Sequence, residues 1–178
     1  MGFGLRRLVA PGFCAFALAG CASPPPPSYD LSSATTPLRV GAIAGPLLID
    51  EPDASDILDS DRIVIRQGGD QLAYLGKAQW ADRLPRLLRA RLTSAFERAK
   101  LARSIVSSGM VYDYRLTTEI RRFEVDVSTH EARIEIVARI VAGANGRVLA
   151  TQTFAARALD IAAQDATARI LRWTVAAI

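Results

Sequence analysis

The chain has 178 residues, with 22 basic and 18 acidic side chains, one histidine and two cysteines. This length accommodates one compact domain plus a short extension, and it excludes a large multidomain enzyme. The formal net charge of +4 is modest, and the basic residues, nearly all arginine, are scattered along the chain, so the composition predicts no nucleic-acid partner.

Residues 1–20 have the pattern of an export signal. Arg6 and Arg7 precede a mostly apolar run over residues 8–18, and two small residues follow at 19 and 20. As a helix, this run would span only about 16 Å, roughly half of the hydrocarbon core of a bilayer. We therefore predict a cleaved signal peptide rather than a permanent transmembrane helix.

The end of this segment, Leu18-Ala19-Gly20-Cys21, resembles the lipobox of bacterial lipoproteins. The resemblance implies that the Cys21 thiol accepts a diacylglyceryl group and that the mature protein, acylated at Cys21, is held in a membrane by several acyl chains. Ala22 and Ser23 directly follow Cys21, with no aspartate beside it, which resembles the sorting pattern of outer-membrane lipoproteins. The alternative is a plain secreted protein in which Cys21 lies near the cleavage point by chance.

The sequence after Cys21 predicts a tether and one folded domain. Residues 21–28 contain four consecutive prolines, a composition typical of a semi-rigid polyproline II spacer. Residues 29–178 contain no second linker of this kind, so we predict a single domain there.

The first half of the domain predicts strands, an acidic loop and a helix. Apolar runs at 38–44, 62–66 and 71–75 predict strands, the last two joined as a hairpin by Gly68-Gly69-Asp70. The carboxylate-rich segment 50–61 is expected to be a loop. An apolar stripe with helical spacing over 78–100 predicts the main helix, which should start near Leu84 or be kinked there because of Pro85.

The second half predicts a long strand, a hairpin and a second helix. Alternation over 111–127 indicates a strand whose packed face changes after Arg121-Arg122, which predicts a β-bulge. Residues 133–141 and 147–156 flank Asn145-Gly146 and predict a hairpin. A helix is expected from Asp160. Together these elements predict an α+β fold, a mainly antiparallel or mixed sheet with two amphipathic helices packed on one face.

The sequence offers no recognisable catalytic, metal or cofactor site. His130 lies between two predicted strands and is expected in a solvated turn. No pair of histidines, phosphate-binding loop or Gly-x-Ser-x-Gly motif occurs, and no cofactor is predicted. The carboxylates of segment 50–61 lack the spacing of a calcium loop, so weak cation binding or a partner contact is the alternative to a solvated loop. Paired carboxylates of the glycosidase kind stay open, but nothing selects a pair.

Several segments resemble the ABC-type transport auxiliary lipoprotein family, which includes lipoproteins of the paraquat-inducible protein C type. These segments are LDSDRIVIR (58–66), LAYL (72–75), QWADRLP (79–85), DYRL (113–116) and IRRFE (120–124). The resemblance implies a non-enzymatic lipoprotein of a Gram-negative envelope. Its implied location is the periplasmic face of the outer membrane.

The same resemblance implies a role in lipid transport. The partners would be a mammalian-cell-entry (MCE) domain protein with its ABC permease and ATPase. The domain would dock onto this assembly through an exposed sheet face or edge, and a ring of identical copies is one form that it could take. Two other functions stay open: a shuttle that encloses an acyl chain between helix and sheet, and an envelope hydrolase.

Overall fold

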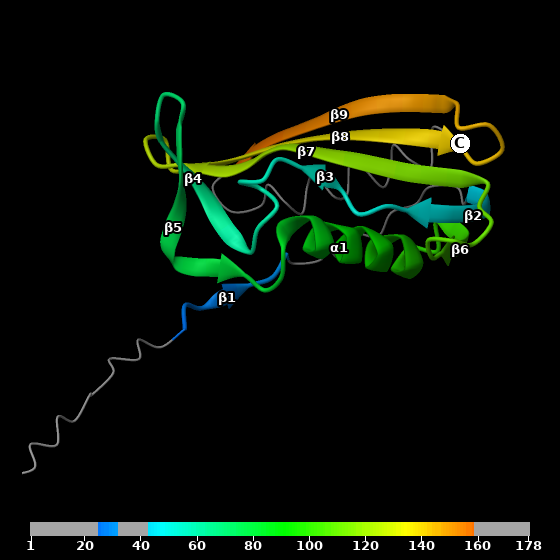
Figure 1. Cartoon of the computed structure of the whole chain (residues 1–178), viewed down its shortest axis with the longest axis horizontal. Coiled ribbons are helices and arrows are strands. Elements are labelled where there is room, and N and C mark those ends of the chain that lie inside the picture. Colours follow the sequence, from blue (N-terminus) through cyan, green and yellow to red (C-terminus); the bar gives the residue numbers. More distant parts are fainter. Residues whose placement is uncertain (1–24, 32–42, 159–178) are drawn as a thin grey trace, which may run out of the picture.

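The described part of the molecule is a mixed β-sheet with one helix along a face. The computed structural model describes residues 25–31 and 43–158. Nine strands form the sheet, and helix α1 (Leu84–Arg98) runs along it (Figure 1). The mixed sheet agrees with the predicted α+β class. The prediction of two helices is not borne out, because the described residues contain one helix. The helix predicted from Asp160 lies outside the described residues.

The longest strand, β7 (Tyr114–Asp126), organises the sheet. Three shorter strands follow one another along one of its edges, all parallel to it, and a hairpin continues the sheet antiparallel from the other edge. The three short strands are β2 (Ile43–Ile49), β3 (Asp53–Ala54) and β4 (Arg62–Gly68), and the hairpin consists of β8 (Glu131–Ala142) and β9 (Val148–Ala158). Strand β7 therefore spans the molecule from β2 at one end to β4 at the other.

Three further strands extend the two ends of this arrangement. At one end, β5 (Gln71–Trp80) pairs antiparallel with β4, and the two-residue strand β1 (Ser28–Tyr29) pairs with the last residues of β5. At the other end, β6 (Ala102–Val106) pairs parallel with β2. The β4–β5 hairpin is the predicted one: Gly68 ends β4 with φ of +133°, and Gly69, with φ of +53°, forms the turn with Asp70.

Helix α1 starts where Pro85 requires. It begins at Leu84, with the proline in the first turn, where its missing N–H needs no partner. Of the two alternatives that the sequence allowed, the start near Leu84 is thus confirmed. The prediction was wrong at its N-terminal end, because Trp80 belongs to β5 and packs edge-on against the ring of Phe123 at a centroid distance of 5.6 Å.

The predicted bulge in β7 is confirmed. The register with β8 shifts between Ile120 and Arg122, so that Arg121 is the extra residue. Before the shift, Leu116 and Ile120 face the core, and after it Phe123 does. The extra residue explains how one strand keeps its apolar side chains on a single face although their spacing in the sequence changes.

The strand predicted at 38–44 lies later in the chain than expected. Strand β2 runs from Ile43 to Ile49 and includes Pro46, whereas residues 38–42 lie outside the described part. The backbone oxygen of Pro46 accepts a hydrogen bond from Asp113 N at 3.0 Å, so the proline contributes to the sheet as an acceptor although it cannot donate. Strand β6 was not predicted at all.

The space between α1 and the sheet is filled by large apolar side chains. Leu88, Leu92 and Phe96 of the helix are at most 1% exposed, and they belong to one cluster with Leu47 and Leu116 of the sheet. At about 25 cal/mol for each Å² of buried apolar surface, this layer is the main source of stability in the described part of the domain.

The segment that enters the domain is held to the end of β5. The Ser28 hydroxyl accepts a hydrogen bond from Gln79 Nε2 at 3.2 Å, and Ala81 N donates to the carbonyl of Tyr29 at 2.7 Å. Asp30 pairs with Arg91 of α1, and Leu31 is buried in the core. The chain that follows the predicted tether is thereby fixed at the end of the sheet that carries β4 and β5 (Figure 1).

Candidate functional site

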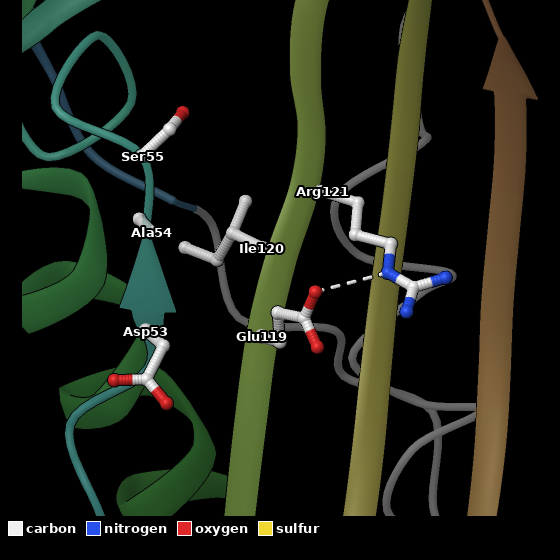
Figure 2. Close-up of a pocket in the computed structure, with 6 residues that line it drawn as sticks. All are labelled: Asp53, Ala54, Ser55, Glu119, Ile120 and Arg121. Carbon is white, nitrogen blue, oxygen red and sulfur yellow. Dashed lines mark hydrogen bonds and ion pairs between the residues drawn. The ribbon is translucent and has the colours of Figure 1, made fainter.

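A surface pocket of about 440 Å³ opens where β3 ends beside the bulge of β7 (Figure 2). The parallel register pairs Asp53 with Glu119 and Ala54 with Ile120, which brings two carboxylates to the same part of the sheet. The pocket is lined by Asp53, Ala54, Ser55, Glu119, Ile120 and Arg121. Because Arg121 is the bulged residue, the irregularity of β7 places its side chain at this pocket.

Two arginines hold the carboxylate of Glu119 at the pocket. It accepts hydrogen bonds from Arg139 Nη2 at 3.0 Å and from Arg121 Nε at 3.1 Å. These two bonds, that from Arg139 first, lower the pKa of the Glu119 carboxyl from its ordinary value. An ionised carboxylate held by two guanidinium groups is an acceptor and a poor source of protons, so this pocket is better suited to binding than to acid catalysis.

The pocket contains a serine, Ser55, but no histidine. His130 lies in the exposed β7–β8 turn with φ of +55°, and it does not line the pocket. Ser55 therefore has no histidine beside it to activate its hydroxyl. Within residues 25–31 and 43–158, no three His, Cys, Asp or Glu side chains converge as a metal site.

Three of the six carboxylates in the acidic segment 50–61 pair with two arginines. Asp50 pairs with Arg115 at 2.5 Å, whereas Glu51 at 3.3 Å and Asp59 both pair with Arg83. The segment is mostly loop, as predicted, but it contains the short strand β3. Its carboxylates thus point to different partners, an arrangement unlike the converging oxygens of a calcium site.

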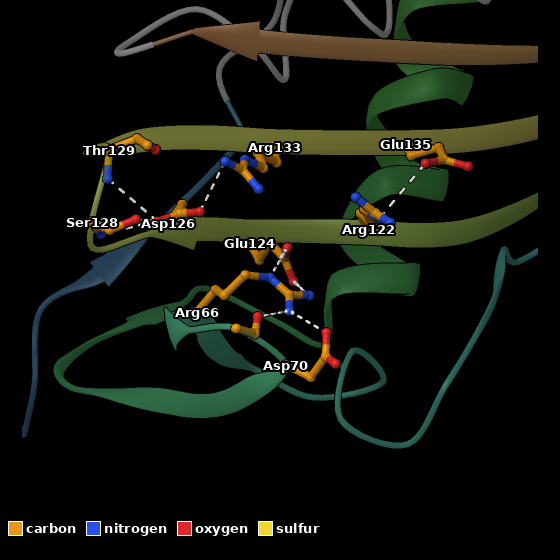
Figure 3. Close-up of polar contacts among 10 residues, drawn as sticks. Arg66, Asp70, Arg122, Glu124, Asp126, Ser128, Thr129, Arg133 and Glu135 are labelled. Atoms are coloured by element: carbon orange, nitrogen blue, oxygen red, sulfur yellow. Dashed lines mark hydrogen bonds and ion pairs between the residues drawn. The ribbon is translucent and has the colours of Figure 1, made fainter.

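A second polar cluster lies at the β4 end of β7, on the side away from α1 (Figure 3). Arg66 donates to both carboxylate oxygens of Glu124, from Nε at 2.7 Å and Nη2 at 3.0 Å. This planar two-bond pairing joins β4 to β7 and is supported by a third bond, from Arg66 Nη1 to the carbonyl of Gly69 at 2.8 Å. Its geometry is that of a structural tie between strands.

Asp126 in the same cluster fixes the turn between β7 and β8. Its Oδ1 accepts bonds from the Ser128 hydroxyl at 2.5 Å and from the backbone N–H groups of Ser128 and Thr129 at 2.9 and 3.3 Å, and Arg133 lies 2.9 Å from its other oxygen. The Ser128 hydroxyl bond is the largest cause that holds the pKa of Asp126 below its usual range, against the opposing effect of burial.

The depressed pKa of Asp126 predicts a pH-dependent stability. A carboxyl whose pKa is lower in the folded state stabilises the fold fully above its unfolded pKa of about 3.9, and this contribution is lost as the pH falls through the folded value. Urea unfolding should therefore show a smaller loss of stability on acidification in Asp126→Asn and Ser128→Ala than in the wild type. Ser108→Ala, in an exposed loop, is the matched control and should follow the wild type; a Ser128→Ala profile identical to that of the control would contradict this assignment.

The charges on this outer face of β7 and β8 compensate one another. The bulged residue Arg121 and the next residue, Arg122, both approach Glu135. The distances are 3.8 Å from Arg121 Nη1 to Glu135 Oε1 and 3.7 Å from Arg122 Nε to Glu135 Oε2. Together with Glu119 and Arg139 they form one ion-pair network. A face on which arginines and carboxylates alternate has little net charge, so it is unlike a surface for nucleic acid or anionic lipid.

The predicted lipid-attachment residue, Cys21, lies outside the described residues. Among the residues that are described, no helix has the length and apolar character needed to cross a bilayer. The sequence predicts a family resemblance and a bulge at the IRRFE segment (120–124), but it does not predict that Glu119, Arg121 and Asp53 line a pocket. The predicted bulge was the one signal that pointed to this place.

Comparison with known protein families finds one matching family model. The model of a family described as ABC-type transport auxiliary lipoprotein component matches residues 29–178. An uncharacterized protein of Bradyrhizobium diazoefficiens is 31% identical over 172 residues, which make up 85% of this chain and 45% of that protein. The chain thus spans less than half the length of this curated relative.

Two solved structures resemble the fold. The crystal structure of protein XCC0632 from Xanthomonas campestris has a TM-score of 0.76 at 26% identity, and the match covers 84% of this chain and 95% of that one. A crystal structure of an uncharacterized protein has a TM-score of 0.59 at 15% identity, with 86% and 93% covered, which is a likeness of fold alone.

Proposed function

The chain belongs to the family of ABC-type transport auxiliary lipoprotein components, and from this premise we propose that it docks onto the extracytoplasmic part of an MCE-type ABC transport system. In this proposal the protein is anchored through lipid at Cys21 to the periplasmic face of the outer membrane. The lipobox-like sequence before Cys21 and the absence of aspartate after it support this location.

The chemistry of the described residues supports docking over catalysis. The carboxylates Glu119 and Glu124, which could act as acids or bases, are held by arginine, and no histidine lies beside Ser55 in the pocket. A transport auxiliary protein needs no energy-consuming site of its own, because the ATPase is a different chain. The single observation that carries the proposal is the family match over residues 29–178.

The packed core favours docking over the lipid-shuttle alternative. An acyl chain enclosed between helix and sheet would need a cavity there, and α1 fills this layer with Leu88, Leu92 and Phe96. Within the described part, an acyl chain would have to displace side chains that are at most 1% exposed, which is costly in a close-packed interior.

Co-purification tests the proposal. The full-length, lipidated and tagged protein is recovered from detergent-solubilised envelopes of its native host, and co-purified proteins are identified by mass spectrometry. We expect an MCE-domain protein with its permease and ATPase, and we expect the tagged protein in the outer-membrane fraction of a density gradient. Correctly lipidated protein that recovers none of these partners would contradict the proposal, and stoichiometric co-purified phospholipid would favour the shuttle.

A further inference from the structure

The end of the domain opposite β1 carries the two most exposed large apolar side chains of the described residues. Val111 is 87% exposed and Met110 is 57% exposed, both in the loop between β6 and β7, and Val148 at the start of β9 is 50% exposed. Isolated exposed apolar residues are common, but these three lie at one end of the sheet, where the β6–β7 loop and the β8–β9 turn are in contact.

The loop that presents Met110 and Val111 is held in a defined conformation. A turn is closed by Met110 N, which donates to Ser107 O at 3.2 Å, and it depends on Gly109 with φ of +91°. The loop is then fixed at its other side, where Gly143 N donates to the carbonyl of Asp113 at 2.8 Å. The apolar tip is therefore a built projection with backbone bonds on both sides.

Positive charge without carboxylate partners lies at the same end of the described part of the domain. Lys100 follows the C-terminus of α1, Arg103 lies on β6, and Arg147 lies in the β8–β9 turn, all exposed. Together with Arg98 they make four cations at this end, against the carboxylates Glu97 and Asp113. In the part of the chain that the structure describes, none of the four forms an ion pair, in contrast to the compensated arginines of the outer face.

This end also lies far from the predicted membrane anchor. Strand β7 separates it from the end that carries β4, β5 and β1, and thirteen residues at about 3.3 Å each span roughly 43 Å. The part of the predicted tether that follows Cys21, residues 22–28, has seven residues and reaches at most about 25 Å when fully extended. A domain anchored beyond β1 therefore presents the opposite end away from its own bilayer.

We propose that this distal surface, defined by Met110, Val111, Lys100, Arg103 and Arg147, is where the protein binds the extracytoplasmic subunit of its transport system. The inference rests on the proposed function and specifies the surface that performs it. The chemistry fits a partner segment with an apolar pocket flanked by carboxylates, because apolar anchors supply affinity and complementary charge supplies orientation and association rate.

A matched pair of valines tests the location. Val111 precedes β7 and Val127, which is 45% exposed, follows it, so the two mark opposite ends of the same strand. A photo-crosslinking amino acid at position 111 of the full-length lipidated protein should capture the extracytoplasmic subunit of the transport system in intact cells, and the same group at position 127 should not. A crosslink at 111 to phospholipid, to a second copy of this chain or to nothing would overturn the inference.

Charge and apolar variants test the chemistry. In the co-purification experiment, Val111→Asp and the double variant Arg103→Glu/Arg147→Glu should each reduce the recovered partner about tenfold or more, whereas Val127→Asp should leave it unchanged. All these positions are exposed, so thermal unfolding should match the wild type. If the wild type recovers the transport subunits and the distal variants recover them equally well, the surface is wrong and the function stands; if the wild type recovers none, the proposed function itself fails.

Discussion

Cys21→Ala should abolish incorporation of fatty acid into the protein completely. The thiol is the only atom of residue 21 that can carry the diacylglyceryl group, and alanine offers no nucleophile in its place. Each buried methylene of an acyl chain contributes about 0.8 kcal/mol, so loss of all chains removes the stable anchoring that we predict. Metabolic labelling with an alkyne fatty acid, followed by gel analysis of the immunoprecipitated protein, measures the effect.

The chain contains its own control for this experiment. Cys14 is the other cysteine and lies inside the predicted signal peptide, so Cys14→Ala should leave labelling, cleavage before residue 21 and membrane binding unchanged. The lipoprotein assignment of Cys21 fails if Cys21→Ala stays labelled, or if it is cleaved at an unchanged point and remains as firmly membrane-bound as the wild type.

Gly143→Ala is expected to destabilise the domain by about 1–3 kcal/mol, the usual cost of forcing extra atoms into a packed site. A Cβ at this position would overlap the carbonyl oxygen of Tyr112, which is backbone and cannot move aside as a flexible side chain would. The β6–β7 loop or the β8–β9 turn must therefore shift. Urea unfolding of the purified domain measures the change.

The control for Gly143→Ala is Gly76→Ala. Gly76 lies in β5, and an added Cβ there would meet no atom within 4 Å, so we expect a change within about 0.5 kcal/mol. Equal losses for the two variants would mean that conformational freedom, and not the contact with Tyr112, determines the effect at position 143.

The elements that could be predicted from the sequence are those whose signal is local. Pro85 indicated the first turn of α1, Gly68-Gly69 indicated a hairpin, and the changed alternation after Arg121 indicated a bulge. In each case a single backbone constraint, the fixed φ of proline, the positive φ of glycine or the two-residue period of a strand, determines the structure without reference to the rest of the chain.

The elements that were missed depend on distant partners. Strand β6 is a five-residue edge strand with an arginine and a serine at its centre, and it is specified by its parallel pairing with β2. Trp80 matched the helical stripe by spacing, but it completes β5 because Phe123, 43 positions later in the chain, offers its ring. Neither pairing leaves a periodic trace in the local sequence.

The candidate surfaces were beyond sequence reasoning for the same reason. The pocket at Asp53 and Glu119 exists because β3 pairs with β7 beside the bulge, and the distal surface exists because the turn after β8 contacts the loop after β6. From sequence alone, the arginines were a uniform scatter. In the part of the chain that the structure describes, arginines such as Arg121 and Arg122 pair with carboxylates on the outer face, whereas Arg98, Arg103 and Arg147 at the distal end form no ion pair.

The two-residue strand β1 has a mechanical consequence. With the lipid anchor that we predict at Cys21, a pull from the bilayer would reach β1 at Ser28 and would be resisted first by the pairing of β1 with β5 and by the contact between Asp30 and Arg91. These few bonds are exposed at one end of the sheet, whereas β7 is paired with neighbouring strands along both of its edges. Under load, the pairing of β1 with β5 should therefore break before the rest of the sheet opens. The released residues would lengthen the tether while the fold stays intact.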